Sequence, residues 1–349
     1  MSISTAPHIH DHDVTKKASA PAPRWRIGIA GSSQHTQICA AALAKDPRLM
    51  IAWVLTPAPQ PQGRQRVLTP NPLHQWAEEN HVPTAFVPSK LSLESVRAAL
   101  STAGVSEVAQ RPDILLVIDF GYYVPTPLLG WPSCAPVNIH PSALPKWRGS
   151  SPGQFTLLFG EKTAAVSVIH MTKALDAGAI YWQEEFAVEP TWTTSEYYQF
   201  AFTRVAANIA SILVDIATQR ATPQPQPIDS PTMVARRLTR GDGYIEWERL
   251  YKLLDPANQA AWPFTAPTAQ PEFPPSPLFL EVSQMGVAWP NLLAQASLAL
   301  APWPGLWTVV QTNKGTRRLK LLELRNTERG LELQCAQLEG ERPKRVAST

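Results

Sequence analysis

The chain has 349 residues, which exceeds one typical domain and favours two. Its hydrophobic fraction of 44% excludes an intrinsically disordered protein. Its net charge of +3 permits a nucleic-acid partner but does not require one.

Three features bear on the compartment. The three cysteines are scattered, odd in number and without metal-ligand spacing, which predicts a reducing environment and no disulfide framework. No stretch approaches eighteen consecutive apolar residues, so we expect no membrane span. Residues 1–23 lack the apolar core of a signal peptide and the arginines of a transit peptide, and we expect a disordered tail there. The prediction is a cytoplasmic, bacterial protein, with an organellar location left open.

The first elements predict an α/β fold. An apolar strand over residues 26–30 ends at Gly31, and a helix over 36–44 and a strand over 50–55 follow. This βαβ opening is Rossmann-like. It has one glycine where a dinucleotide-binding fingerprint needs three, so NAD binding is not supported.

Residues 56–72 are too rich in proline to predict an element. A loop of this length is usually functional or disordered. It carries Arg64 and Arg66, which suit contacts with phosphates. A solvated surface loop is the alternative.

Two neighbouring strands deliver polar side chains to one edge of the predicted sheet. After a helix over 73–79, a strand over 84–87 and a helix over 93–100, the apolar run 112–118 predicts a strand buried on both faces. A turn containing Gly121 follows it. The next strand carries Asn138 and His140, which share a face because side chains alternate along a strand. Ligands in open α/β sheets bind at such carboxyl edges.

A carboxylate completes a trio suited to acyl or formyl transfer. Asp176 lies in the glycine-containing loop Leu-Asp-Ala-Gly, about forty residues after Asn138. The amide can donate to a developing oxyanion, the imidazole can take a proton from an amine, and the carboxylate can orient the imidazole.

The joint pattern Asn-x-His-x-Ser-x-Leu-Pro-x-x-Arg-Gly, followed by Leu-Asp-x-Gly, resembles the folate-dependent formyltransferases. Its Trp-Arg-Gly ending is most similar to the methionyl-tRNA formyltransferases. The resemblance implies transfer of a formyl group from 10-formyltetrahydrofolate to the α-amine of methionyl initiator tRNA, by a monomer and without a metal. It assigns the oxyanion role to Asn138, proton removal to His140 and the orienting role to Asp176.

The resemblance also implies binding residues. The folate would lie against Gly121, Ser142, Ala143, Leu144 and Pro145. The tRNA would meet Arg64, Arg66, Arg148, Arg317 and Arg318. Asp119 and Ala143 depart from the residues that the family usually has, a small residue and a leucine.

The remaining pattern predicts two domains. A helix over 149–159, strands over 164–171 and 180–186 and a helix over 198–217 complete a catalytic domain of residues 24–218. The proline-rich segment 219–231 is predicted as a linker with few contacts across it, so that residues 1–219 fold alone. Residues 232–349 are predicted as an OB-like tRNA-binding domain, with strands over 307–311, 319–324 and 331–335. Residues 257–301 allow no prediction.

Three alternatives stay open. The first is a formyltransferase whose acceptor is a small amine such as glycinamide ribonucleotide. The second is a formyltetrahydrofolate hydrolase, which uses water in place of the amine. The third alternative is a non-enzymatic RNA-binding protein on this scaffold, which the intact trio disfavours.

Overall fold

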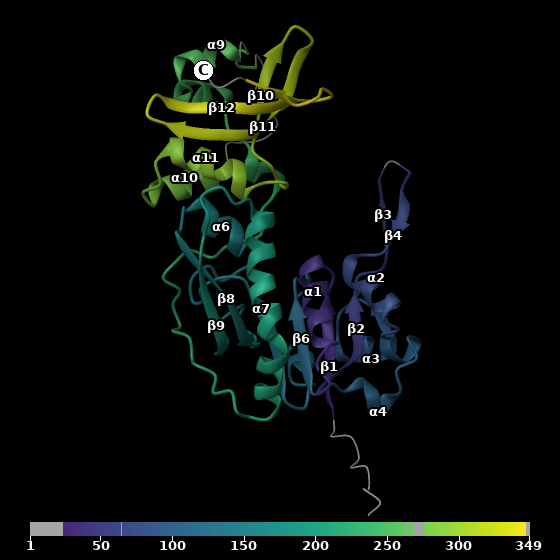
Figure 1. Ribbon diagram of the computed structural model, residues 1–349. Helices are drawn as coiled ribbons and strands as arrows, with labels where there is room; N and C mark the ends of the chain where they lie inside the picture. Colours follow the sequence, from purple (N-terminus) through teal and green to yellow (C-terminus); the bar gives the residue numbers. More distant parts are fainter. Residues whose placement is uncertain (1–23, 64, 263, 268–275, 347–349) are drawn as a thin grey trace, which may run out of the picture.

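The computed structural model describes residues 24–63, 65–262, 264–267 and 276–346. The predicted tail of residues 1–23 and the Arg64 side chain lie outside the described residues. A seven-stranded sheet with the order β5-β2-β1-β6-β7-β8-β9 forms the larger part (Figure 1). Its strands are β1 (Trp25–Gly31), β2 (Leu49–Thr56), β5 (Thr84–Phe86), β6 (Ile114–Ile118), β7 (Ala135–His140), β8 (Thr163–His170) and β9 (Ile180–Ala187). The first five are parallel, and β8 and β9 are antiparallel.

Helices cover both faces of the parallel strands, and each face has its own core. The helices of this part are α1 (Gln34–Leu43), α2 (Pro72–Glu79), α3 (Leu93–Thr102), α4 (Glu107–Gln110), α5 (Thr126–Leu129), α6 (Pro152–Leu158) and α7 (Thr194–Ala217). One core contains buried residues of α1, α2, α6 and α7, and the other contains those of α3 and α5. On β6, Leu116 belongs to the first core and Leu115 and Val117 to the second. This confirms the prediction of a strand buried on both faces.

The long helix α7 is a core helix. Its 24 residues are long and apolar enough to cross a membrane by length and composition alone. Half of its most apolar window is buried inside the protein, however, and Ala201, Val205 and Ile209 on its inner side have no exposure. A polar cap begins it, because the Thr193 hydroxyl and the Glu196 carboxylate exchange bonds with each other's backbone N–H.

The C-terminal part combines short helices with an antiparallel sheet. Its helical elements are the 3₁₀ turn η1 (Arg240–Gly243), α8 (Trp247–Leu253), α9 (Pro256–Ala261), α10 (Pro277–Gln284) and α11 (Trp289–Ala299). Four strands follow in the order β10 (Trp307–Thr312), β11 (Gly315–Thr327), β12 (Gly330–Leu338) and β13 (Lys344–Arg345). The predicted fold class, an open α/β sheet followed by a small β-rich unit, is confirmed. The α10 and α11 helices lie in the stretch for which the sequence allows no prediction, and each has a proline in its first turn, where proline is compatible with a helix.

Two sequence-based expectations are wrong. Two short strands, β3 (Gln60–Gln62) and β4 (Val67–Thr69), pair as an antiparallel hairpin in the stretch expected to be an irregular loop, and the hairpin projects from the body of the protein (Figure 1). The segment 219–231, expected to make few contacts, lies against the first part. Gln224 forms a two-way backbone bridge with Ile180, and the Ser230 hydroxyl donates to the Pro145 carbonyl. The domain boundaries themselves stay a prediction.

In the C-terminal part, the backbone of Gly243 lies close against the backbone of Gly305, which leads to a stability prediction. A Cβ on Gly243 would lie 1.8 Å from the carbonyl oxygen of Gly305, whereas one on Gly241 would meet its nearest atom, in Thr239, at 3.7 Å. Backbone cannot move aside cheaply, so Gly243→Ala should lower the melting temperature by about 3 °C or more. The matched variant Gly241→Ala should change it by about 1 °C or less. Thermal denaturation of the two variants checks this, and equal melting temperatures would contradict the packing described.

Candidate active site

A cavity of about 610 Å³ lies at the carboxyl edge of the sheet. The turn after β6, the end of β7 and the loop between β8 and β9 all line it. Asn138, His140 and Asp176 are among its lining residues, so the structure brings the predicted trio together. The alternation along β7 explains the placement: Val137 and Ile139 belong to the main core, which leaves Asn138 and His140 on the opposite face.

A backbone carbonyl orients the His140 ring. The Nε2 atom lies 3.0 Å from the carbonyl oxygen of Trp147, and the side chain is 5% exposed. A carbonyl only accepts, so Nε2 carries the hydrogen and Nδ1 of the neutral ring has the lone pair. Nδ1 faces the Asp176 carboxylate at 3.7 Å, beyond hydrogen-bond length and within ion-pair range once the ring is protonated. The Trp147 carbonyl thus orients the ring, and the orienting role expected of Asp176 stays a prediction.

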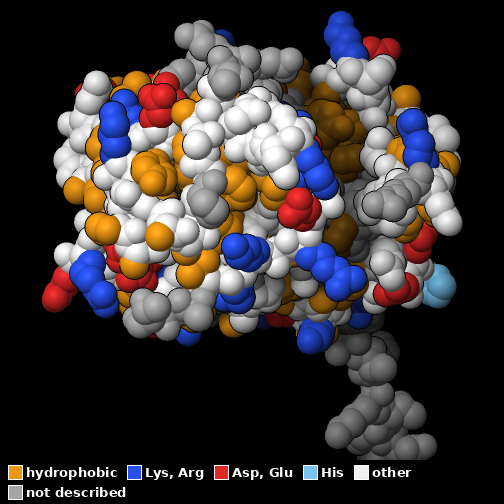
Figure 2. Space-filling model, turned by 90° about the horizontal axis from the view of Figure 1, so that it is seen from above, with side chains coloured by type: hydrophobic (Ala, Val, Ile, Leu, Met, Phe, Trp, Pro, Cys, Tyr) orange, Lys and Arg blue, Asp and Glu red, His pale blue; other side chains and the backbone are white. Residues whose placement is uncertain are grey.

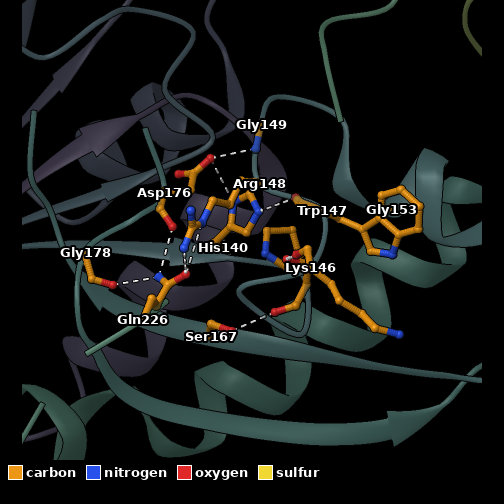
Figure 3. A network of polar contacts seen from close by, with 12 residues as sticks. His140, Lys146, Trp147, Arg148, Gly149, Gly153, Ser167, Asp176, Gly178 and Gln226 are labelled. Carbon is orange, nitrogen blue, oxygen red and sulfur yellow. Dashed lines mark hydrogen bonds and ion pairs between the residues drawn. The ribbon is translucent and has the colours of Figure 1, made fainter. Parts of the chain in front are cut away.

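The Asp176 loop is folded back onto the residues that follow β7. Gly178 permits this, because a Cβ there would lie 1.7 Å from the His170 carbonyl oxygen. Asp176 has a φ of 50°, a conformation that aspartate tolerates better than most residues. Its Oδ2 accepts a hydrogen bond of 2.9 Å from the backbone N–H of Gly149. The carboxylate is therefore held by a backbone donor and faces the imidazole (Figure 3).

Arg148, predicted to contact tRNA, is engaged inside the protein. Its guanidinium donates to Gln226 Oε1 and to the carbonyl oxygens of Pro227 and Ile228. Gln226 in turn donates to the carbonyl oxygens of Asp176 and Gly178 (Figure 3). These contacts support a structural role for Arg148, and its contact with RNA stays a prediction.

The residues expected to frame the folate divide into two groups. Gly121 lines the cavity, and a Cβ on it would point into open space. The cavity lining contains none of Ser142, Ala143, Leu144 and Pro145. Ser142 and Leu144 are buried, and the Ser142 hydroxyl is turned to the Lys146 carbonyl at 2.8 Å. The contact of this stretch with folate stays a prediction.

Asp119, at the turn after β6, lines the cavity in a left-handed conformation with a φ of 46°. Its Oδ2 accepts hydrogen bonds from the Ser33 hydroxyl at 2.8 Å and from Nδ1 of His35 at 2.7 Å. The His35 ring stacks on Phe202 with a centroid distance of 4.6 Å. These contacts hold the turn in place although the family's small residue is missing.

Tyr198 on α7 is a further polar group in the cavity wall. Its hydroxyl donates to Gln154 Oε1 at 2.7 Å and accepts from the Gly153 N–H at 3.1 Å. Burial raises the pKa of Tyr198 well above its ordinary value, so the phenol stays protonated and remains a donor at neutral pH.

The other arginines expected to contact tRNA differ in their exposure and in their contacts within the protein. Arg66 is exposed at the turn of the β3–β4 hairpin, and its neighbour Arg64 lies outside the described residues. Arg317 pairs with Glu341 at 3.0 Å, and the Arg318 guanidinium lies 4.5 Å from the Trp307 ring centroid. Lys and Arg side chains are scattered over the upper face of the molecule, on both sides of a hollow lined by hydrophobic side chains (Figure 2).

Sequence reasoning missed several residues at or beside this cavity. Arg237 and Trp303 line it from the C-terminal part, and Gln226 lies beside it in a proline-rich segment whose composition predicted only a linker. No sequence signal distinguished them. Within the described residues, no group of three or more His, Cys, Asp or Glu side chains is arranged to hold a metal ion. The expectation that the reaction needs no metal stays a prediction.

Comparisons with known proteins agree with the geometry. A family model described as formyl transferase matches residues 27–212, more than half of the chain. Methionyl-tRNA formyltransferase of Acidithiobacillus ferrooxidans is 27% identical over 246 residues, which are 68% of this chain and 75% of that protein. Methionyl-tRNA formyltransferase of Rickettsia rickettsii is 32% identical over 201 residues, 57% of this chain and 63% of that protein.

The fold has solved counterparts. The crystal structure of an N-formyltransferase from Helicobacter canadensis, in complex with folinic acid and dTDP-3-aminofucose, matches with a TM-score of 0.52 and 15% identity. The match covers 87% of this chain and 89% of that one, and at this identity it shows the shared fold alone. Because the family model matches more than half of the chain, including most of the seven-stranded sheet and the Asn138, His140 and Asp176 positions, the chain belongs to the formyl transferase family.

Proposed function

We propose that the protein transfers the formyl group of 10-formyltetrahydrofolate to the α-amine of methionyl initiator tRNA and so serves translation initiation. The observation that carries the proposal is the convergence of Asn138, His140 and Asp176 on one cavity in a chain of this family. The curated relatives described above bear the name of this enzyme.

The geometry supports a direct transfer. The amine nitrogen attacks the formyl carbon, and the negative charge that develops on the formyl oxygen is stabilised by the Asn138 amide N–H. The Nδ1 lone pair of His140 takes the proton from the attacking amine. The imidazolium formed in this way lies 3.7 Å from the Asp176 carboxylate, which stabilises its charge. The bond from the formyl carbon to N10 then breaks, and the imidazolium returns its proton to N10, which leaves as the neutral amine.

The folate is expected on the Gly121 side of the cavity. Gly121 and the backbone after β6 leave room there. The acceptor amine has to approach His140, and Arg237 and Trp303, which line the cavity from the C-terminal part, are placed to meet its carrier. The exposed hairpin with Arg66 and the basic side chains of the C-terminal sheet provide phosphate contacts for a large polyanion.

The acceptor is tested by competition. Purified protein is supplied with 10-formyltetrahydrofolate and either methionyl initiator tRNA, glycinamide ribonucleotide or water alone, and the loss of the formyl donor is measured. Formylation of methionyl-tRNA well above the other two supports the proposal. Preferred consumption with the ribonucleotide, or without any amine, would refute it.

His140→Ala should lower kcat by about 10²–10⁴-fold, the usual effect of losing a positioned general base. Folate binding should change little, because the ring acts on the amine. Steady-state kinetics and folate titration measure both. The exposed His81, which has a φ of 55°, supplies the control: His81→Asn should stay within about twofold of wild type. An active His140→Ala enzyme would remove this residue from the mechanism.

Asn138→Ala should lower kcat by about 10²–10³-fold, because a preorganised donor to the oxyanion is lost. Asn138→Asp keeps the size of the side chain but places a carboxylate where negative charge develops, so it should not restore activity. Single-turnover rates with saturating donor compare the two variants. Near-normal rates for the Asp variant would disprove the oxyanion role.

Arg66→Ala should weaken the binding of methionyl-tRNA and leave folate binding unchanged, because Arg66 lies on a projecting hairpin outside the cavity. Loss of one phosphate contact should reduce the slope of log Kd against log salt by about one. Lys45 is an exposed cation just past the C-terminal end of α1, and Lys45→Ala is the control of equal charge. If both variants had the same salt slope, Arg66 would make no contact with the tRNA phosphates.

A further inference from the structure

Gln226 is the one side chain of segment 219–231 that bonds both to the Asp176 loop, between β8 and β9, and to Arg148, in the loop after β7. Its Nε2 donates to the carbonyl oxygens of Asp176 at 3.0 Å and Gly178 at 2.6 Å. Its Oε1 accepts from Arg148, from Nε at 3.2 Å and from Nη2 at 2.9 Å. Two carbonyl oxygens only accept and a guanidinium only donates, so the amide fits in one orientation. We propose that Gln226 is a positioning residue that holds the Asp176 loop in its active geometry.

The loop benefits from this support because its internal bonds converge on Ala174 rather than on Asp176. Asp176 lies in a left-handed conformation between β8 and β9, and Leu175 beside it is 64% exposed. Inside the loop, the Ala174 carbonyl accepts from the Thr172 hydroxyl at 3.1 Å and from the Ala177 N–H at 3.4 Å. Gln226 binds the carbonyl groups on both sides of the turn, at Asp176 and two residues later, and so fixes the backbone from which the carboxylate projects.

The Gln226 contacts belong to a hydrogen-bond network that includes residues 147–149, which precede α6. Trp147 accepts from His140, Arg148 donates to Gln226, and Gly149 donates to the Asp176 carboxylate. Three consecutive residues therefore fix the base, the positioning residue and the carboxylate, and Gln226 joins this network to the Asp176 backbone (Figure 3). Displacement of Asp176 by about 1 Å would weaken the stabilisation of the imidazolium, and misplacement on that scale can cost about 100-fold in rate.

The inference rests on the proposed function, and the kinetic test separates a positioning role from a merely structural one. Gln226→Ala should lower kcat by about 10–100-fold while the KM for 10-formyltetrahydrofolate stays within about twofold. Gln226→Glu retains an acceptor for Arg148 but sets an oxygen against two carbonyls, so it should be equally slow. Gln224 provides the matched control. It is exposed in the same segment, its side chain reaches only the Thr222 carbonyl at 3.4 Å, and Gln224→Ala should match wild type.

A double-mutant cycle with Asp176→Asn decides the matter. If Gln226 acts through Asp176, then Gln226→Ala should cost less than about twofold in the Asp176→Asn background, because coupled residues are not additive. The proposal would be overturned if the double variant lost the product of the two single-variant losses in kcat. It would also be overturned if Gln226→Ala kept the wild-type kcat. Melting temperatures of all variants are recorded, and Gln226→Met, which keeps the volume and loses the hydrogen bonds, replaces Gln226→Ala if the latter fails to fold.

The cycle uses the full chain with 10-formyltetrahydrofolate and methionyl initiator tRNA. If the wild-type protein instead formylates glycinamide ribonucleotide or releases formate, the proposed acceptor is wrong, and the same cycle is measured with that reaction. The two failures are thereby distinguished.

Discussion

Parallel pairing of β6 with β7 brings the turn after β6 and the Asn138 and His140 side chains to one edge of the sheet. Val117 pairs with Asn138 in this register, so the two strands end side by side and the turns that follow them meet at one edge. The pairing is firm because β6 is buried on both faces and a shift by one residue would turn its neighbour's core side chains outward. Asn138 and His140 face the cavity only because Val137 and Ile139 occupy the core. A packing requirement thereby determines the direction of the reactive side chains.

Backbone groups, rather than other side chains, do much of the positioning around the reactive pair. The Trp147 carbonyl fixes which nitrogen of His140 carries the hydrogen, and the Gly149 N–H holds the Asp176 carboxylate. Backbone dipoles of this kind are fixed by the fold and need little reorganisation during a reaction. The carboxylate is then free to act through its charge, at a distance where an ion pair forms only when the imidazole has gained a proton.

Much of the larger part was predictable, for reasons that are local. Apolar runs and their alternation located β1, β2, β6, β8 and α7 to within a few residues, and the spacing of Asn138 and His140 placed them on one face. The family resemblance is confirmed by the formyl transferase match. Other features depend on contacts that no local sequence pattern encodes. Whether Ser142 faces the cavity or the Lys146 carbonyl is decided by how the turn after β7 folds, which no periodicity encodes. Composition also suggested a free linker around Gln226, whose partners lie some fifty and eighty residues away in sequence.

The backbone bonds between Arg148 and Ala235 have a consequence for building hybrid proteins. The Arg148 carbonyl accepts from the Ala235 N–H, and the Ala235 carbonyl accepts from the N–H of Ser151, so the chain after the proline-rich segment is hydrogen-bonded to the 148–151 loop, whose Gly149 N–H holds the Asp176 carboxylate. A chimera joined within residues 219–231 would place a foreign segment around Ala235 against the 148–151 loop. Joining the chains after Leu238, which lines the cavity, would keep the loop and the segment that bonds to it from the same parent. By its contacts, the segment belongs to the half of the chain that it follows.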